Sequence, residues 1–363
     1  MEFTFSAERL LIQTNFAPIV SVLVLIAFIK TNRSFTDRIN RNFLIACTAS
    51  ILLTASDNMR FISARLAEPT IYRYISAGFG YTFRSVILYL LMCISGRHQK
   101  HRNKIYSIPL ILCILFSVIS IFPFGRGIVF SFSDQNKFIR GPLGFLPHIV
   151  CYFYAFFIIF YSIKNYRYNK FETLIVIITE FFAIIAMLME NRFKFDFVLS
   201  QILIYSIIFY YFFILTQTYK RDTLTHLLNR RCFYLEINHR LKNPMVMLSM
   251  DLNNLKVFND TQGHAAGDRA LITVTDAMRK HFSKFGQLYR TGGDEFMAVF
   301  LKIDLQTAEE LVKEFQNELS QTEYQVACGL AQYTPGDNID KIITMSDERM
   351  YSNKTKIKNE KNL

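Results

Sequence analysis

The chain has 363 residues, a formal net charge of +12, 51% hydrophobic residues and six cysteines. Residues 217–363 carry 20 Lys and Arg against 19 Asp and Glu, which leaves 21 against 10 in the first 216 residues. Because the second part is almost neutral, the net charge gives no reason to expect a nucleic-acid partner. The cysteines form no Cys-x-x-Cys pair, so neither a zinc site nor a disulfide framework is expected.

Seven apolar stretches in residues 1–216 predict a bundle of membrane-spanning helices, because one span needs roughly 20 mostly apolar residues. Four stretches carry no charged residue, and they are residues 10–29, 105–125, 141–163 and 197–219. Three more are each interrupted by one ionisable residue: residues 43–59 by Asp57, residues 74–95 by Arg84 and residues 173–189 by Glu180. The first stretch follows Glu2 and Glu8 rather than basic residues, so we expect it to be retained and not cleaved as a signal peptide.

Basic residues are concentrated in the loops that would follow the first, third and fifth spans. They are Lys30, Arg33, Arg38, Arg41, Arg97, Lys100, Arg102, Lys104, Lys164, Arg167 and Lys170. Lysine and arginine are enriched in cytoplasmic loops. The pattern therefore predicts a multi-pass protein of the inner (cytoplasmic) membrane with its N-terminus outside. Residues 1–216 would form a polytopic transmembrane sensor domain, and residues 217–363 a cytoplasmic domain.

Asp57, Arg84 and Glu180 would be costly inside a lipid bilayer, so they need a role. They could recognise a sensory ligand, whose identity the sequence does not give. They could instead pair with one another and link the helices, for example as an ion pair between Arg84 and Glu180.

Residues 217–363 alternate between β-prone apolar runs and amphipathic segments, which predicts an α/β domain. Strands are expected near residues 244–250, 287–291, 295–300 and 325–331. Helices are expected over residues 251–262, 268–285, 305–320 and 339–356. A length of about 140 residues suits one domain.

Residues 290–296 read Arg-Thr-Gly-Gly-Asp-Glu-Phe between two of these strands. Gly292 and Gly293 are expected to supply the positive φ of a tight hairpin turn, with Asp294 and Glu295 at its tip. Adjacent carboxylates without a lysine beside them repel each other, so Mg²⁺ is the simplest partner for them. A solvated acidic turn is the alternative.

A second polar segment begins at Asp251, where the strand at 244–250 is expected to turn into a helix. Asn253, Asn254 and Lys256 would lie in the first helical turn. Unpaired backbone amides and the helix dipole favour phosphate oxygens at that position. The segment is therefore a candidate phosphate site.

Further polar residues follow this helix and could recognise a nucleotide base. They are Asn259, Asp260, Gly263, His264, Gly267 and Asp268. An amide and a carboxylate at this spacing could read the edge of guanine, which offers two donors to a carboxylate. His264 could instead be a satisfied turn residue.

Together with residues 222–231, which read Asp-Thr-Leu-Thr-His-Leu-Leu-Asn-Arg-Arg, these segments resemble the GGDEF domain of diguanylate cyclases over about residues 220–358. The resemblance implies a mixed five-stranded sheet flanked by helices, related to nucleotidyl cyclase and polymerase palm domains. It also implies an activity, the condensation of two GTP molecules into cyclic di-GMP with release of two pyrophosphates.

The resemblance assigns roles to residues of this sequence. Two Mg²⁺ ions, or Mn²⁺, would be held by Asp251, the Leu252 carbonyl and Glu295. Glu295, beside Asp294, would also be the general base. The groups implied for GTP are Lys256 and the amides of Asn254 and Leu255 for phosphates, Lys354 and Lys358 for the β and γ oxygens, and Asn259 and Asp268 with His264 close by for guanine. The alternative for the two C-terminal lysines is a solvated tail.

The sequence departs from the family pattern at several positions. Asn253 stands where aspartate is common, and Arg349 replaces a small residue. Residues 357–358 are Ile-Lys in place of Gly-Arg, and lysine cannot fork onto a phosphate as arginine does, which predicts a weaker grip on the γ-phosphate. The Arg-x-x-Asp motif of the family's product-inhibition site is absent, because residues 283–286 read Ser-Lys-Phe-Gly.

A homodimer is implied because each domain would bind one GTP and the product needs two. The pairing would use the GGDEF domain and the membrane helices, and the last span runs into the domain with almost no linker. The alternative function is a membrane receptor that binds GTP or cyclic di-GMP without turnover. The intact Asp251, Lys256, Asp294 and Glu295 argue against it, and Asp268 disfavours synthesis of cyclic GMP-AMP.

Overall fold

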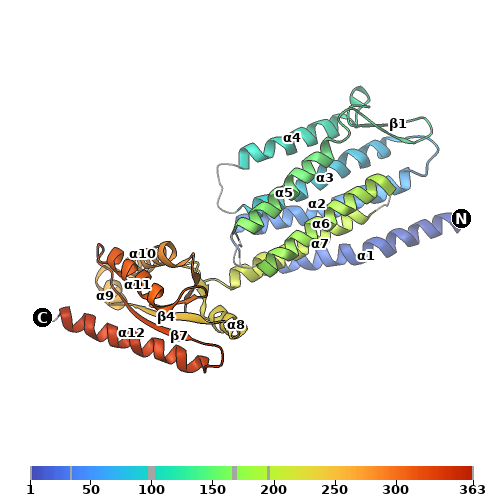
Figure 1. Cartoon of the computed structure of the whole chain (residues 1–363). Helices are drawn as coiled ribbons and strands as arrows, with labels where there is room; N and C mark the ends of the chain where they lie inside the picture. Colours follow the sequence, from blue (N-terminus) through green and yellow to red (C-terminus); the bar gives the residue numbers. More distant parts are fainter. Residues whose placement is uncertain (1, 33–34, 97–102, 166–169, 194–196, 362–363) are drawn as a thin grey trace. The chain divides into compact units, whose positions relative to one another are not determined.

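A computed structural model describes residues 2–32, 35–96, 103–165, 170–193 and 197–361 of the chain. The chain divides into two compact units, Met1–Thr216 and Gln217–Leu363. The first unit is helical apart from one short hairpin, and the second combines a sheet with helices (Figure 1).

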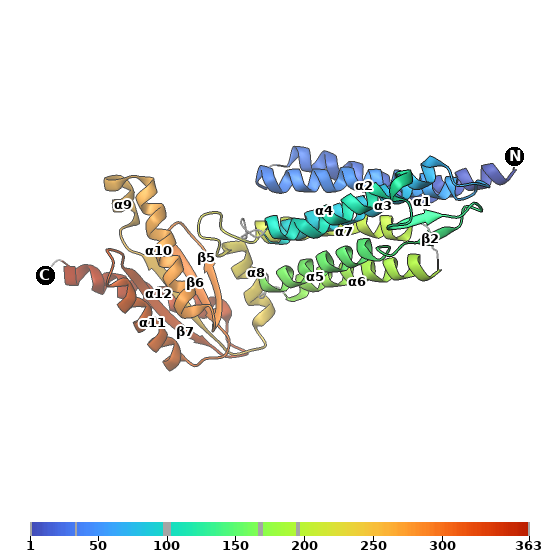
Figure 2. The same ribbon diagram turned by 90° about the horizontal axis from the view of Figure 1, so that it is seen from above.

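The N-terminal unit contains a long helix on each of the seven predicted stretches. In chain order the helices are α1 (Glu2–Thr31), α2 (Asp37–Ser63), α3 (Ile71–Ser95), α4 (Asn103–Ile119), α5 (Leu146–Asn165), α6 (Lys170–Phe193) and α7 (Val198–Tyr219). They lie side by side in both views (Figures 1 and 2). The unit is therefore a helical bundle.

Five of these described helices are long and apolar enough to cross a membrane: α1, α3, α5, α6 and α7. Helix α4 is shorter than predicted because it ends at Ile119, and a short 3-10 helix, Pro123–Gly125, follows. Phe122, the residue before Pro123, has an extended backbone with ψ 150°, as is usual before proline, so no α-helix runs through it. Helix α2 is long but carries five charged residues, which are Asp37, Arg38, Arg41, Asp57 and Arg60. The prediction of seven spans is thus supported for five by length and composition.

A β-hairpin that the sequence did not predict connects α4 and α5. Strands β1 (Phe130–Phe132) and β2 (Phe138–Arg140) pair antiparallel, at the end of the bundle where α1 begins (Figures 1 and 2). Asn136, with φ +59°, lies at the turn and donates from Nδ2 to the backbone oxygens of Ser63 and Leu66, at 2.8 and 2.9 Å. The hairpin is therefore anchored to the end of α2.

The bundle exposes many large apolar side chains. On α1 they include Leu10, Ile12, Phe16, Leu23 and Val24, which are 43–67% exposed. Such an apolar surface suits lipid better than water. Of the basic loop residues, Arg33, Arg97, Lys100, Arg102 and Arg167 lie outside the described residues.

The charged residues of the predicted spans are buried, and Asp57 and Arg84 pair with each other, as one of the two hypotheses expected. Arg84 Nη2 donates to Asp57 Oδ1 at 3.3 Å and to Glu190 Oε1 at 2.8 Å. Glu180 is 2% exposed, and its Oε2 has no hydrogen-bond partner among the described residues. The Arg84–Glu180 pair is therefore wrong. Its place is taken by Glu190, which lies one residue beyond the predicted apolar stretch.

The C-terminal unit is built on a mixed five-stranded sheet, which confirms the predicted fold. Its strand order is β3-β5-β6-β4-β7, with β3 parallel to β5 and all other neighbours antiparallel. The strands are β3 (Leu228–Asn229), β4 (Met245–Leu252), β5 (Gly286–Arg290), β6 (Glu295–Phe300) and β7 (Val326–Tyr333).

Helices cover both faces of this sheet (Figure 1). Helices α10 (His264–Phe282) and α11 (Leu305–Leu319) pack on one face, and α8 (Arg230–Arg240) and α12 (Ile339–Lys361) pack on the other. Side chains of β4 alternate between the two cores, because successive residues of a strand point to opposite faces. Val246 and Leu248 face α10 and α11, and Met245 and Met247 face α8 and α12.

Two boundaries near the predicted site differ from the sequence expectation. Strand β4 continues to Leu252, and α9 (Leu255–Gln262) begins only after Asn254, whose φ is +61°. Asn253 and Asn254 therefore lie in a turn rather than in a helix. Helix α10 begins at His264 instead of residue 268, because Gly263, with φ +82°, ends α9 and turns the chain.

Candidate functional site

Asp251 and Glu295 are opposite each other in the register of β4 and β6. Directly opposed residues of an antiparallel pair project to the same face of a sheet, and here that face carries α8 and α12. Asp251 is 6% exposed, whereas Glu295 is exposed. The fold thus brings two carboxylates from separate motifs together, one buried and one open to solvent.

Backbone hydrogen bonds close the turn between β5 and β6. The amides of Thr291 and Gly292 both donate to Glu295 O, at 3.0 and 3.3 Å. Neither Gly292 nor Gly293 has a positive φ, so the prediction that they supply left-handed residues is wrong. A Cβ on Gly292 would lie 2.5 Å from Glu295 Oε2, so this glycine leaves room for the carboxylate.

Arg290, the residue before this turn, joins two segments that the sequence separates. Its Nη1 donates to Asp222 Oδ1 at 2.9 Å, and its Nη2 donates to Gly293 O at 2.7 Å. Asp222 Oδ1 also accepts from N and Oγ1 of Thr225, at 2.8 and 2.7 Å. Burial alone would raise the pKa of Asp222, but the hydrogen bonds from Thr225 and Arg290 hold it below its usual value. Sequence reasoning missed this link, which fixes the turn that carries Glu295.

Lys354 of α12 forms an ion pair with Asp251. Its Nζ donates to Asp251 Oδ1 at 2.6 Å, and its side chain is 23% exposed. Burial raises the pKa of Asp251, and Lys354 offsets only part of that rise. Lys358, one helical turn further on, is exposed and acts on Asp251 through its charge. Lys354, which was predicted to bind phosphate, therefore forms an ion pair with Asp251, which was predicted to bind a metal ion.

Two tertiary contacts hold α12 against β7 and so position Lys354. Asn353 Oδ1 accepts from Cys328 N at 3.0 Å. A Cβ on Gly329 would collide with the backbone of Ser346 and Met350, so the close approach of α12 depends on glycine there. The sequence gave no role to Cys328 or Gly329, because their effect exists only where the helix and the strand pack together.

The loop after β4 is tied to the β5–β6 turn and leads into α9. Leu252 N donates to Asp294 O at 2.9 Å. Asn254, the N-cap residue of α9, makes no side-chain cap hydrogen bond. The first amides of α9, at Leu255 and Lys256, therefore remain available for an anion. The Lys256 side chain is exposed.

Asn259 packs against the start of α10. A Cβ on Gly267 would collide with the side-chain amide of Asn259, so this glycine allows the contact. Asp268 follows Gly267 directly and is exposed, as is His264. The structure therefore brings the residues predicted to read guanine to one place between α9 and α10.

A cleft opens beside Glu295, between α8 and α12. Its lining includes Arg230, Tyr234, Asp347 and Tyr351. The Glu295 carboxylate is therefore reachable from solvent along this face of the sheet.

A comparison with protein families assigns the C-terminal unit. Residues 219–360 match the family described as diguanylate cyclase, GGDEF domain. This segment is a GGDEF domain. The match begins at the last residue of α7 and includes every residue of the site described above.

Curated relatives and solved structures are similar to part of the chain. The chain is 30% identical over 143 residues to probable diguanylate cyclase DgcJ of Escherichia coli K12, covering 37% of this chain and 29% of that protein. It is 30% identical over 159 residues to diguanylate cyclase DgcN of the same strain, covering 39% and 38%. The chain thus spans about a third of the length of these relatives. The coiled coil and GGDEF domain of DgcB from Caulobacter crescentus, in complex with c-di-GMP, aligns with a TM-score of 0.39 and 21% identity, covering 40% of this chain and 85% of that one.

The GGDEF domain offers few protein ligands for a metal. The described residues contain no group of three or more His, Cys, Asp or Glu that could hold one. Mg²⁺ is commonly held by one or two carboxylates, with waters and substrate phosphates completing its shell. Asp251 already holds a cation, the ammonium of Lys354. Asp251 and Glu295 could therefore supply only part of a metal shell, and the Lys354 ammonium would have to leave Asp251 Oδ1 before an ion bound there.

The segment that would form a product-inhibition site is packed in a way that excludes its acidic residue. Gly286 opens β5, and a Cβ there would collide with the carbonyl oxygen of Val299. An aspartate cannot replace Gly286 unless the strands shift.

Proposed function

We propose that the chain is a membrane-bound diguanylate cyclase, which condenses two GTP molecules into cyclic di-GMP and two pyrophosphates under control of its N-terminal helices. The observation that carries the proposal is the pairing of Asp251 with Glu295 across β4 and β6, beside the lysine-bearing helix α12. The GGDEF match and the diguanylate cyclase relatives support the same chemistry.

In this proposal Asp251, the Leu252 carbonyl and Glu295 hold Mg²⁺ or Mn²⁺, two ions per site. The ions, when bound, neutralise the triphosphate and activate the attacking hydroxyl. Glu295 is exposed at the start of β6, so it can take the proton of a ribose 3′-hydroxyl. Asp294 shapes the site, because its backbone oxygen holds Leu252 N.

The triphosphate would be held from two sides. The amides of Asn254 and Leu255 and the side chain of Lys256 lie at the start of α9, where an anion is favoured. Lys354 and Lys358 approach from α12, one helical turn apart, and would take the β and γ oxygens.

Guanine would be bound between α9 and α10 by Asn259 and Asp268, with His264 close by. A carboxylate in this pocket is satisfied by the two donors of guanine and is left unpaired by adenine. Asp268 is exposed in the absence of a nucleotide, so this discrimination requires that the bound base exclude water from its carboxylate. GTP is therefore the proposed substrate, and ATP a poor one.

The reaction requires two GGDEF domains, because each would bind one GTP and the product contains two. A two-fold homodimer through the GGDEF domain and the helical bundle is the simplest arrangement. The five long apolar helices and the basic loops support a place in the inner membrane, with the N-terminus outside. Helix α7 ends at Tyr219, immediately before the GGDEF domain, so a signal from the bundle has a short covalent path to the enzyme.

The test is mass spectrometry of the products formed by detergent-purified full-length protein with GTP and Mg²⁺. Wild type and a Glu309→Gln control, which changes an exposed glutamate on α11, should form cyclic di-GMP. Glu295→Gln should form none. Product from Glu295→Gln would overturn the role given to Glu295.

Two outcomes would separate the enzyme from a GTP-binding receptor. A wild-type protein that binds GTP but forms no product should be fused to a dimerising coiled coil and measured again. Product after forced dimerisation would identify a cyclase that was waiting for its signal. Continued inactivity with GTP bound would support the receptor.

A further inference from the structure

One carboxyl group lies in the interior of the N-terminal unit without a partner. Glu180 of α6 is 2% exposed, and its Oε2 has no hydrogen-bond partner among the described residues. It also takes part in no ion pair with any described residue. Glu190 on the same helix differs, because its Oε1 accepts from Arg60 and Arg84, at 2.7 and 2.8 Å. Buried polar groups normally find a partner, so Glu180 requires an explanation.

Glu180 lies in the middle of the inner face of α6. The residues of this face recur every three or four positions and are 2–6% exposed: Thr173, Val176, Glu180, Ala183 and Met187. Such spacing places side chains on one side of a helix. Phe181 and Phe182, which lie off this face, are 57% and 52% exposed. The neighbours one turn before and after Glu180 are valine and alanine, so they offer its carboxyl group no polar contact.

The titratable side chains of the neighbouring helices make their contacts elsewhere. Four tyrosines of α5 and α7 belong to the same hydrophobic core as Val176 and Met187: Tyr154, Tyr161, Tyr210 and Tyr211. The two on α5 donate to Tyr106, at 2.8 and 3.3 Å. Tyr210 hydrogen-bonds to Ser95, and Tyr211 packs edge-on against Phe43. The charged Glu190 lies ten residues further along α6, or about 15 Å at 1.5 Å per residue. No charge among the described residues therefore compensates an ionised Glu180.

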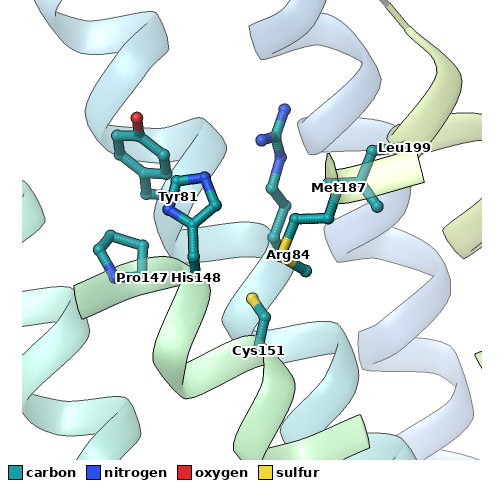
Figure 3. Close-up of a pocket in the computed structure, with 7 residues that line it drawn as sticks. All are labelled: Tyr81, Arg84, Pro147, His148, Cys151, Met187 and Leu199. Atoms are coloured by element: carbon teal, nitrogen blue, oxygen red, sulfur yellow. The ribbon is translucent and has the colours of Figure 1, made fainter. Parts of the chain in front are cut away.

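A small hollow lies on the same face of α6, but Glu180 is not part of its lining (Figure 3). Figure 3 shows Arg84 and Met187 across from His148, with Cys151 below them. Met187 is the residue that α6 contributes, two helical turns from Glu180. The enclosed part of the hollow has room for about one water molecule. A metal ion needs several oxygen ligands, and neither the hollow nor the apolar neighbours of Glu180 supply them there.

We infer that Glu180 is a proton-binding site, in which a proton joins the carboxylate and gives the neutral carboxylic acid. Burial of an unpaired carboxylate is so costly that such a group takes up a proton instead. The occupant must also fit without a cavity and without further ligands. Among cations only the proton meets both conditions, because it bonds to the carboxylate oxygen itself.

Release of the proton would leave an uncompensated charge on the inner face of α6. The ionised form is therefore stable only if α6 repacks or water enters beside Glu180, which gives the bundle two states that differ by one proton. Helix α6 is joined to α2 and α3 through the ion pairs of Glu190 with Arg60 and Arg84. It is followed by α7, the helix that leads to the GGDEF domain. The site goes beyond the proposed cyclase activity and does not depend on it.

Infrared spectroscopy of full-length protein in lipid nanodiscs tests the inference. The spectrum of wild type minus that of Glu180→Gln should contain the carbonyl stretch of a protonated carboxyl group at neutral pH. The same subtraction with Glu309→Gln, which changes an exposed glutamate of α11, should not contain it. Raising the pH should remove the band reversibly. Absence of the band at neutral pH, or a band that persists at every pH at which the protein stays folded, would overturn the inference.

A chemical readout in wild-type protein remains available if Glu180→Gln fails to fold. A hydrophobic carbodiimide adds to a protonated carboxyl group, and the adduct rearranges to an N-acylurea without loss of atoms. Peptide mapping at neutral pH should find this label on Glu180 and not on Glu190, which two arginines hold as a carboxylate. Equal labelling of the two glutamates, or absence of the label from both, would refute the site.

Neither measurement depends on cyclase activity. Protein that shows the infrared band and the label but forms no cyclic di-GMP would contradict the proposed function and leave this inference intact. Protein that forms cyclic di-GMP without the band would do the reverse.

Discussion

Replacing Lys354 by methionine should tighten the binding of a divalent ion to the nucleotide-free protein. The Lys354 ammonium lies 2.6 Å from Asp251 Oδ1, so an ion that uses this oxygen must first displace it. Methionine keeps an unbranched side chain and removes the charge. The substitution therefore tests whether the lysine and the proposed metal compete for one carboxylate.

The structure gives the expected size of this effect. At 2.6 Å and an effective dielectric constant of about 20, the attraction between the two charges is about 6 kcal/mol. Desolvation offsets most of it, and a hydrogen bond between charged groups contributes about 1.5–3 kcal/mol net. The Lys354 side chain keeps 23% exposure, which favours the lower end of that range. The expected gain in metal affinity is therefore about tenfold.

The assay is a Mn²⁺ titration of full-length protein without nucleotide, with the free ion followed by electron paramagnetic resonance. Lys358→Met is the matched control, and it should change affinity less because Lys358 acts on Asp251 only through its charge. The Lys354→Met protein should also bind GTP more weakly, since a phosphate ligand is lost. An unchanged or weaker affinity for Mn²⁺ would refute the competition.

The pKa of Asp251 gives this assay a pH dependence. Burial raises that pKa, so protons compete with the ion at a higher pH than they would at an exposed aspartate. Affinity for Mn²⁺ should therefore fall as the pH is lowered through the raised pKa. A wild-type affinity that stays constant until the pH reaches the ordinary aspartate range would show that Asp251 does not bind the ion.

Three further outcomes are expected. Asp222→Asn should destabilise β5 and β6 by about 1–2 kcal/mol near neutral pH, seen as faster hydrogen exchange, because it removes charged hydrogen bonds. The pKa of Asp222 is lowered in the fold, so this contribution to stability is present above the unfolded pKa of about 3.9 and is lost as the pH falls through the folded pKa. A stability difference between wild type and Asp222→Asn that persists in acid would contradict the reasoning. Lys358→Arg should lower the KM for GTP a few fold, because arginine can fork onto phosphate, and an unchanged KM would count against contact with the γ-phosphate. Cyclic di-GMP should not inhibit the enzyme through residues 283–286, where Gly286 packs against Val299; tight inhibition that Lys284→Ala abolishes would be the contrary result.

Local patterns predicted most of the elements, but not the strands β1, β2 and β3 or helix α8, and the five-stranded sheet was implied by the resemblance to GGDEF domains. Each apolar stretch of the N-terminal unit carries a helix, and the four strands expected after residue 217 are β4, β5, β6 and β7 of the sheet. Both predictions succeed because hydrophobic periodicity depends on neighbouring residues, and each element must bury its own apolar face. The motif around Asp294 and Glu295 was also local, since it is contiguous in the chain.

Contacts between distant residues depended on the tertiary structure. The sequence offered Glu180 as a partner for Arg84, but Arg84 pairs with Asp57 and with Glu190, and Glu190 lies just outside a predicted span. The family resemblance predicted that Lys354 binds a phosphate. In the structure, α12 packs against Gly329, and Lys354 forms an ion pair with Asp251. Strand register, helix ends and burial set which charged groups meet, and these depend on the whole packed unit. The sequence by itself therefore determined which chemical groups are present and on which elements they lie, while only the tertiary structure decided which of them touch.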